Sequence, residues 1–351
     1  MDDPRAWYLI NALPRQLSTF MHSAQIGFDE DTVVAAVLAG RIYVNGLVAT
    51  SSNEVVLPCD IVTLDGTRCK ILIRANSTIY AYYKPTDMTC DKHGLGGVIS
   101  AFCHVGPRPL HHVGRLDKDT TGLLLFTDDG DLTRLLTRPG NVSKEYVVGW
   151  EANADSKGMT DETLAALQDS NPSRLTSKQG DHCFASFESC SVPVKVEEFP
   201  VYNGHSKRAH FESSVLISSG QNHVVKRLFQ QLGGISVRWL HRRAIGPLTL
   251  ECLGIDHHPM SWIRLSETAV AELWQVCGGV SSLLQMKRTE LWQRLNARPE
   301  DARFLLEELK KREALMAAAY EENREVLEWI RQCALKAVHT GGALENGADA
   351  I

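Results

Sequence analysis

The most specific stretch of this chain is VGRLDKDTTGLLLF at residues 113–126. A charged Arg-x-Asp cluster lies between two turn-forming glycines, and the apolar run Leu123–Phe126 that follows predicts a buried β-strand. A loop that a rigid strand holds in place is a common support for a catalytic carboxylate. Arg115 and Asp117 are therefore candidate site residues, although these two residue types also form ordinary structural salt bridges.

Strand-like runs continue on both sides of this stretch, and few long helices separate them. The expected strands are Ile71–Ile73, Thr78–Tyr83, Leu123–Phe126, Tyr146–Trp150, Val215–Ser218 and Val237–Leu240. Short strands alternating with turns favour a mixed α+β sheet over a doubly wound parallel one. Residues 151–182 are polar, and we expect them to form an insertion with a short helix at residues 160–168.

The N-terminal part, residues 1–70, is predicted to be a small module of its own. Helical periodicity covers residues 15–26 and 30–39, and Asn45-Gly46 is a strong hairpin signal. About 60 residues are few for an independent core.

The C-terminal part, residues 281–340, is predicted to be a helical extension with a flexible tail at residues 341–351. Residues 301–338 are dense in good helix formers and would extend roughly 55 Å as one unbroken helix. Its apolar residues share one approximate face. We expect this face to pack against its own protein, and the alternative is a protein partner docked on the helix.

Composition places the chain among globular proteins: 351 residues, 44% hydrophobic and 23% charged, enough for two or three domains. The nine cysteines include no Cys-x-x-Cys pair and are expected to be reduced intracellular thiols, without a disulfide framework or a metal site. No apolar run approaches the roughly 18 residues of a membrane span. The N-terminus does not resemble a signal peptide. We therefore expect an intracellular, cytoplasmic protein without membrane contact, or an organellar one if a presequence has been removed.

Charge is distributed unevenly along the chain. Residues 201–250 carry seven basic and one acidic side chain, whereas residues 1–66 carry three basic and eight acidic ones. Because salt screens exposed charges within about 8–10 Å, such local excesses matter more for a polyanion than the net charge of −5. The net charge therefore does not exclude a nucleic-acid ligand, and the pattern predicts a confined binding face.

Residues 113–126 closely resemble the signature loop of the pseudouridine synthases, in particular of the RsuA-type branch that acts on ribosomal RNA. Further motifs follow in the order of that family. They are Lys84-Pro85, Thr127–Leu132, Lys144–Val148, Gly220, His223, Val225–Arg227, Gly233, Leu240–Arg242 and Ile245–Leu248. The resemblance covers roughly residues 76–275 and implies a catalytic domain over residues 76–280 with a mixed, mainly antiparallel sheet.

The resemblance implies isomerisation of a uridine within RNA, without a metal, nucleotide or redox cofactor. The base is detached from ribose C1′, turned, and reattached through its C5. Asp117 is implied as the essential carboxylate, which either attacks C1′ or removes the proton on C2′. Lys226 is implied as the partner of Asp117. Tyr146 is implied to stack on the uracil and to help remove the C5 proton, and it fits a core aromatic as well.

Other positions of the motifs imply RNA binding, to ribosomal RNA or a ribosomal assembly intermediate. Arg115 is implied to help turn the target nucleotide out of its helix, or to clamp a phosphate. Four further residues are expected to bind substrate: Lys84, His223, Arg227 and Arg242. We expect most phosphate contacts in residues 201–250, including Arg208 and Arg242, and few in residues 1–66.

Two features depart from the families that the chain resembles. The last motif has Gln221 and Val224 where Arg and Gln are common, which removes one cation and one amide. Residues 17–46 resemble the alpha-L RNA-binding module named after ribosomal small-subunit protein four. That module usually has basic residues entering its second helix, where this chain has residues FDED at 28–31. We therefore expect its fold, with a degenerate RNA contact or a role as an acidic packing arm.

Two other functions compete with this interpretation. A non-catalytic RNA-binding or ribosome-assembly factor could retain the same fold. A metal-dependent hydrolase could use the carboxylates of the DDGD stretch at residues 128–131 to hold magnesium. A turn followed by a helix N-cap explains that stretch better.

Overall fold

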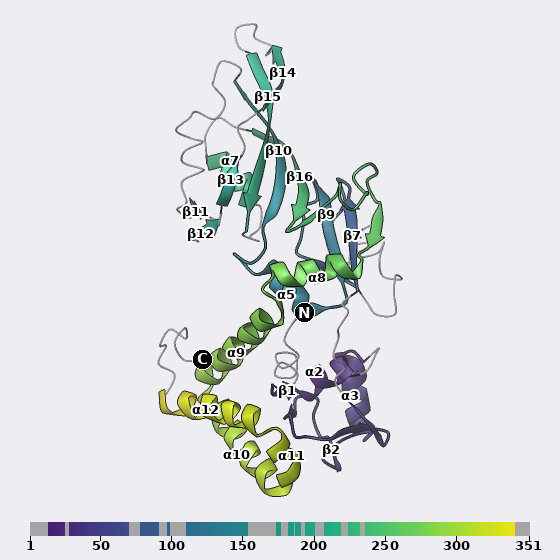
Figure 1. The fold of residues 1–351 in the computed structure, drawn as a ribbon, viewed down its shortest axis with the longest axis vertical. Coiled ribbons are helices and arrows are strands. Elements are labelled where there is room, and N and C mark those ends of the chain that lie inside the picture. Colours follow the sequence, from purple (N-terminus) through teal and green to yellow (C-terminus); the bar gives the residue numbers. More distant parts are fainter. Residues whose placement is uncertain are drawn as a thin grey trace. The chain divides into compact units, whose positions relative to one another are not determined.

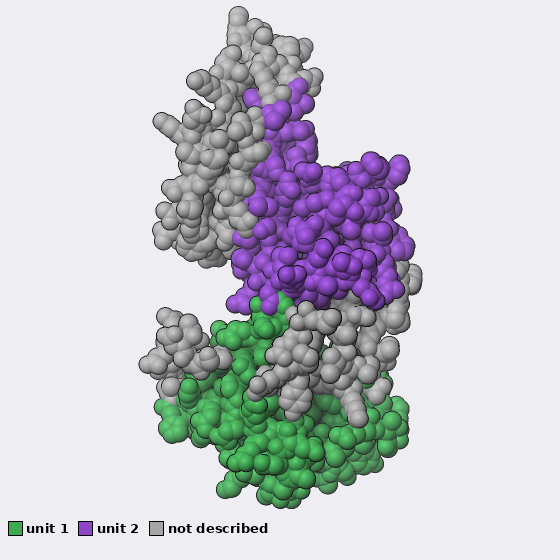
Figure 2. Space-filling model, in the orientation of Figure 1, with its two compact units in different colours: residues 1–75, 279–351 green, residues 76–278 purple. Residues whose placement is uncertain are grey.

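A computed structural model of the chain describes residues 13–24, 28–69, 78–90, 97–98, 110–153, 173–176, 182–185, 187–190, 194–200, 207–218, 224–231 and 236–340. The chain divides into two compact units (Figures 1 and 2). Unit 1 combines residues 1–75 with residues 279–351, and unit 2 comprises residues 76–278.

Unit 2 is built around a large β-sheet. Its elements are β7 (Ile79–Lys84), β8 (His111–Val113), β9 (Thr120–Thr127), α5 (Gly130–Thr137), β10 (Lys144–Asn153), β11 (Ser173–Thr176), β12 (His182–Ala185), β13 (Phe187–Cys190), β14 (Val194–Pro200), β15 (Lys207–Ile217), α7 (Val224–Gln231), β16 (Ser236–Ile245), β17 (Leu248–Thr249), β18 (Trp262–Arg264) and α8 (Glu267–Val276). The main path of the sheet has the order β13-β15-β10-β16-β9-β7-β18, with β14, β17 and β8 paired at its sides. Strands β11 and β12 pair separately.

The sheet is mixed and mainly antiparallel, which confirms the predicted α+β class. Among the described strand pairs of this sheet, β16 and β9 are parallel and the others antiparallel. The two parallel strands approach each other closely at Gly122, which has φ +114°. A Cβ atom at this position would lie only 2.2 Å from the Arg242 carbonyl oxygen. Only glycine permits this approach. It places the start of β9, and the loop before it, against β16.

Helix α7 packs on one face of this sheet. Alternate residues of β10, Tyr146, Val148 and Trp150, lie in one hydrophobic core with Val225 and Phe229 of α7. Period-two alternation in the strand and an apolar stripe on the helix produce this packing. The motif residues Val225–Arg227 on α7 therefore lie beside the sheet.

Unit 1 contains the small N-terminal module. Its elements are β1 (Arg15–Gln16), α2 (Leu17–Ala24), α3 (Glu30–Leu38), β2 (Ile42–Val44), β3 (Leu47–Val48), β4 (Val55–Val56), β5 (Val62–Leu64) and β6 (Thr67–Arg68). Helix α3 begins at the predicted place, because the Asp29 side chain accepts a hydrogen bond from the Thr32 amide. The β2–β3 turn has positive φ at both Asn45 and Gly46, as the predicted hairpin requires.

The same unit contains the C-terminal helices α9 (Gly279–Ala297), α10 (Pro299–Leu315), α11 (Ala317–Glu322) and α12 (Arg324–Thr340). The predicted helical C-terminal region is confirmed, and within it residues 301–338 are divided among separate helices. The chain leaves helical geometry at Met316 (φ −133°, ψ 47°) and turns again at Asn323. The breaks let α12 fold back on α10, so that both helices bury apolar residues in one core.

This core also takes in Leu57 and Cys59 of the N-terminal module. The sequence predicts two separate parts here, residues 1–70 and 281–340, but the structure joins them in one unit. The short module gains the buried area that it lacks alone. Four predictions lie outside the described residues: the strand at 71–73, the helix at 160–168, most of the polar insertion 151–182 and the tail 341–351.

Candidate active site

The loop between β8 and β9 carries Asp117, and Lys84 at the end of β7 holds this loop in place. The Lys84 ammonium donates hydrogen bonds to the carbonyls of Pro85 (2.9 Å), Lys118 (3.2 Å) and Thr120 (2.8 Å). An ammonium group has three donors, and all three are used. Lys84 thus ties the residue after Asp117 to the adjacent strand.

Lys226 on α7 forms an ion pair with Asp117, as the resemblance implies. Its Nζ lies 3.1 Å from Asp117 Oδ2, and the two side chains are only 18% and 19% exposed. The same Nζ lies 2.6 Å from Asp119 Oδ1, on a side chain that is 71% exposed. Sequence reasoning missed Asp119, although its place two residues after Asp117 in the quoted stretch was a usable signal.

The charge on Lys226 is secured by its two partners. Burial lowers the pKa of Lys226, but hydrogen bonds and charges from Asp119 and Asp117 outweigh burial and leave the pKa above its ordinary value of 10.5. Lys226 is therefore a cation at neutral pH. Its ammonium group places a positive charge directly beside the Asp117 carboxylate.

Tyr146 lies on the α7 side of the sheet and is mostly buried. On β10 it stands directly opposite Val215 of β15 and Arg242 of β16. Its ring belongs to the hydrophobic core, so the sequence-level alternative of a core aromatic stays open.

Comparison with known proteins decides the family. A family model described as RNA pseudouridylate synthase matches residues 78–231. An uncharacterised RNA pseudouridine synthase of Mycobacterium bovis is 30% identical over 251 residues, covering 69% of this chain and 86% of that protein. The chain belongs to the RNA pseudouridine synthase family.

Two more members of this family are similar to the chain. Ribosomal small subunit pseudouridine synthase A of Vibrio parahaemolyticus is 29% identical over 253 residues, which are 71% of this chain and 95% of that protein. An uncharacterised RNA pseudouridine synthase of Aquifex aeolicus is 33% identical over 172 residues, or 48% of this chain, and the match spans 58% of its length.

Two residues of this pseudouridine synthase family member that are predicted to bind RNA, Arg242 and Lys84, are buried in the structure. The expectation that Arg242 binds phosphate stays a prediction; its side chain is only 2% exposed, and its Nε donates a hydrogen bond to the Leu123 carbonyl at 2.7 Å. The expectation that Lys84 binds substrate also stays a prediction; Lys84 is completely buried and its donors bind backbone carbonyls. Both cations brace the loop and strands around Asp117 from inside the protein.

The remaining predicted binding residues differ in what the structure says of them. Arg115 is exposed on the loop beside Asp117. Arg227 is partly buried on α7, and its Nε has no hydrogen-bond partner among the described residues. His223 and the altered Gln221 lie outside the described residues, whereas Val224 packs in the hydrophobic core.

Most of the basic side chains that the structure describes within residues 201–250 have partners in the protein, and the side chains of Lys207 and Arg208 lie outside the described part. Arg238 pairs with the buried Glu151 at 2.5 Å, and Arg243 pairs with Glu251 at 2.7 Å. Lys226 and Arg242 are also engaged, as described above. The acidic partners Asp117, Glu151 and Glu251 lie outside residues 201–250, so the net charge counted for this segment does not include them.

The acidic stretch at residues 128–131 caps a helix. The Asp129 carboxylate accepts hydrogen bonds from the amides of Asp131 (3.0 Å) and Leu132 (3.1 Å) at the start of α5. The stretch is thus a turn and N-cap, as predicted. Within the described part of the chain, no three His, Cys, Asp or Glu side chains are grouped as metal ligands. No helix there is long and apolar enough to span a bilayer.

Proposed function

We propose that this chain converts a uridine of ribosomal RNA into pseudouridine, with Asp117 as the essential carboxylate. The observation that carries the proposal is the Lys226–Asp117 ion pair at 3.1 Å, on a loop that Lys84 ties to the sheet. The family membership supplies the reaction class. The similarity to ribosomal small subunit pseudouridine synthase A of Vibrio parahaemolyticus supports ribosomal RNA as the substrate class.

The reaction needs no net change in composition. The N1–C1′ bond of uridine breaks and a C5–C1′ bond forms, so that C5 loses a proton and N1 gains one. An ionised Asp117 acts at the sugar, on C1′ as a nucleophile or on the C2′ proton as a base. Tyr146, opposite Arg242 on the same sheet, is the group we assign to the uracil ring.

Asp117→Asn tests the proposal, because it keeps the shape of the side chain and removes only its charge. We expect no detectable isomerisation and nearly unchanged RNA affinity. Turnover is measured as release of tritium from RNA labelled at uracil C5, with unmodified small- and large-subunit ribosomal RNA transcripts. Asp65→Asn is the matched control, because Asp65 lies in a turn of unit 1 with positive φ, a conformation that Asn also adopts readily.

Three outcomes are informative. Loss of turnover in Asp117→Asn alone supports the assignment. Turnover retained by Asp117→Asn removes this carboxylate from the chemistry. Tight RNA binding by the unaltered protein, without tritium release from any ribosomal transcript, would replace the proposal with a non-catalytic assembly factor.

A further inference from the structure

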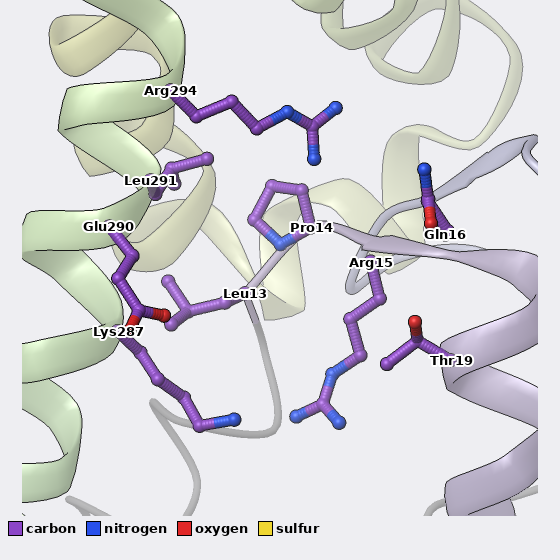
Figure 3. A pocket seen from close by; sticks show the side chains of 9 residues that line it. All are labelled: Leu13, Pro14, Arg15, Gln16, Thr19, Lys287, Glu290, Leu291 and Arg294. Carbon is purple, nitrogen blue, oxygen red and sulfur yellow. The ribbon is translucent and has the colours of Figure 1, made fainter. Parts of the chain in front are cut away.

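Unit 1 contains a pocket of about 300 Å³ between the N-terminal module and α9 (Figure 3). One wall is the face of α9 that presents Lys287, Glu290 and Arg294, spaced by three and four residues and therefore aligned along the helix. The opposite wall includes Arg15 of β1 and Thr19 of α2. Two parts of the chain that are more than 250 residues apart in sequence thus form one site.

The described residues that line the pocket have an excess of positive charge. The lining includes three cations, Arg15, Lys287 and Arg294, and one carboxylate, Glu290. In Figure 3 the charged ends of the three cations reach into the space between the two walls. Arg294 is also 3.4 Å from Asp301, but both side chains are substantially exposed, and such surface pairs are weak and readily exchanged.

This excess is hidden in the sequence. Residues 1–66 have a net charge of −5, yet the acidic start of α3 is not part of the pocket lining. Two of the three cations come from α9, which the sequence assigns to a different part of the chain. Only the packing of α9 in unit 1 gathers them.

We propose that this pocket binds the phosphate backbone of the RNA substrate, with Arg15, Lys287 and Arg294 as phosphate ligands. The proposal rests on the proposed function in that it takes RNA to be the ligand. Guanidinium and ammonium groups from separate elements suit successive phosphates of a chain. The lining also offers the Gln16 amide and Thr19 hydroxyl for hydrogen bonds, and the apolar Leu291 for contact with a ribose.

The pocket gives unit 1 an RNA-binding role that does not depend on basic residues in α3. It also gives the C-terminal helices a role beyond packing, because the module alone supplies only Arg15 among the three cations. The RNA contact of this chain is therefore a composite of its two ends.

The test compares two double variants of the full chain that remove the same charge from the same unit. Arg15→Gln with Lys287→Gln alters the pocket, and Arg303→Gln with Lys310→Gln alters exposed cations of α10 outside it. Affinity for an unmodified small-subunit ribosomal RNA transcript is measured at several salt concentrations. Each phosphate contact contributes about 0.7–0.9 to the slope of log affinity against log salt, so the pocket variant should flatten it by about 1.4–1.8.

A third variant changes the charge in the opposite direction. Glu290→Gln removes the carboxylate of the pocket, so we expect tighter binding at low salt and a slope at least as steep as that of the unaltered protein. This result is independent of any loss of folding in the pocket double variant, which thermal melting would reveal.

Equal slopes for the two double variants, or weaker binding by Glu290→Gln, would overturn the proposal. The tritium-release assay on the unaltered protein is run in parallel. If the unaltered protein releases no tritium but the pocket variant has a flattened slope, the proposed function fails and the RNA-binding pocket stands. If the unaltered protein releases tritium and the pocket variant keeps its slope, the pocket proposal fails and the proposed function stands.

Discussion

Two carboxylates hold Lys226 at once, and they differ in exposure. Asp117 is mostly shielded from solvent, whereas Asp119 is 71% exposed and closer to the ammonium. Asp119 is therefore suited to position Lys226 without touching the substrate. Its hydrogen bond is also the largest of the influences that raise the pKa of Lys226.

Asp119→Asn should lower the pKa of Lys226, because it removes one negative partner while Asp117 remains. Only the neutral amine reacts with acetic anhydride, so at pH 9 Lys226 should be acetylated severalfold faster in the variant, as measured by mass spectrometry. We also expect a lower turnover rate at neutral pH, because Lys226 loses the charged contact with Asp119 that positions it. Asp65→Asn serves as control. An unchanged acetylation rate would show that Asp117 alone determines the charge of Lys226.

At the scale of elements, the close contact between β9 and β16 keeps the loop with Asp117 against the rest of the sheet. The contact depends on Gly122, which has φ +114° and faces the Arg242 backbone. The parallel register pairs Gly122 with Arg242, Thr121 with His241 and Thr120 with Leu240. The Thr121 hydroxyl also lies 2.8 Å from Nδ1 of His241, which adds a side-chain link between the strands.

Gly122→Ala should destabilise unit 2 strongly. The added Cβ would meet the Arg242 carbonyl oxygen, and overpacking of this kind costs about 1–3 kcal/mol, in addition to about 1–3 kcal/mol of backbone strain at positive φ. Gly254→Ala is the matched control, since Gly254 has φ +67° but no atom within 4 Å of the added Cβ. Urea unfolding followed by circular dichroism measures both. Equal losses of unfolding free energy in the two variants would show that backbone strain, without a clash with Arg242, causes the destabilisation.

At the scale of the whole molecule, the two ends of the chain form one unit through a buried ion pair. Arg312 of α10 lies 3.1 Å from Asp60 of the N-terminal module, and the Asp60 side chain is fully buried. Asp60 also accepts hydrogen bonds from Asn45 and from the Leu57 amide. The pair thus connects the β2–β3 hairpin to a helix about 250 residues later in the chain.

Arg312→Met should destabilise unit 1 by about 3–5 kcal/mol, because it leaves the Asp60 carboxylate buried without its cation. Burial raises the pKa of the nearby Cys59 thiol to about 11, so alkylation of Cys59 is slow in the native state. Opening of unit 1 should accelerate this alkylation, which mass spectrometry follows at that residue. Lys311→Met, an exposed neighbour paired with Glu308, is the control and should leave the rate unchanged. Slow alkylation in both variants would contradict the structural role of the pair.

The family and the pairing of Lys226 with Asp117 were implied by the resemblance of the sequence motifs. The α+β class and the strand at residues 123–126 were predictable from local patterns in the sequence, namely short apolar runs bounded by turn residues. Helix α3 and the Asn45-Gly46 turn were predictable for the same reason, since a cap and a positive-φ turn depend on residues within one turn of chain.

The tertiary structure alone decided which charges are available. Lys84 and Arg242 have the same formal charge as any surface cation, but the packing of strands around Gly122 buries Arg242, and the buried Lys84 binds carbonyls of the loop between β8 and β9. Arg238 is neutralised by Glu151, which is distant in sequence. The breaks at residues 316 and 323, and the gathering of Arg15 with Lys287, likewise depend on how remote segments bury apolar area together. A linear pattern carries charge and periodicity, whereas burial and pairing arise only when distant residues meet.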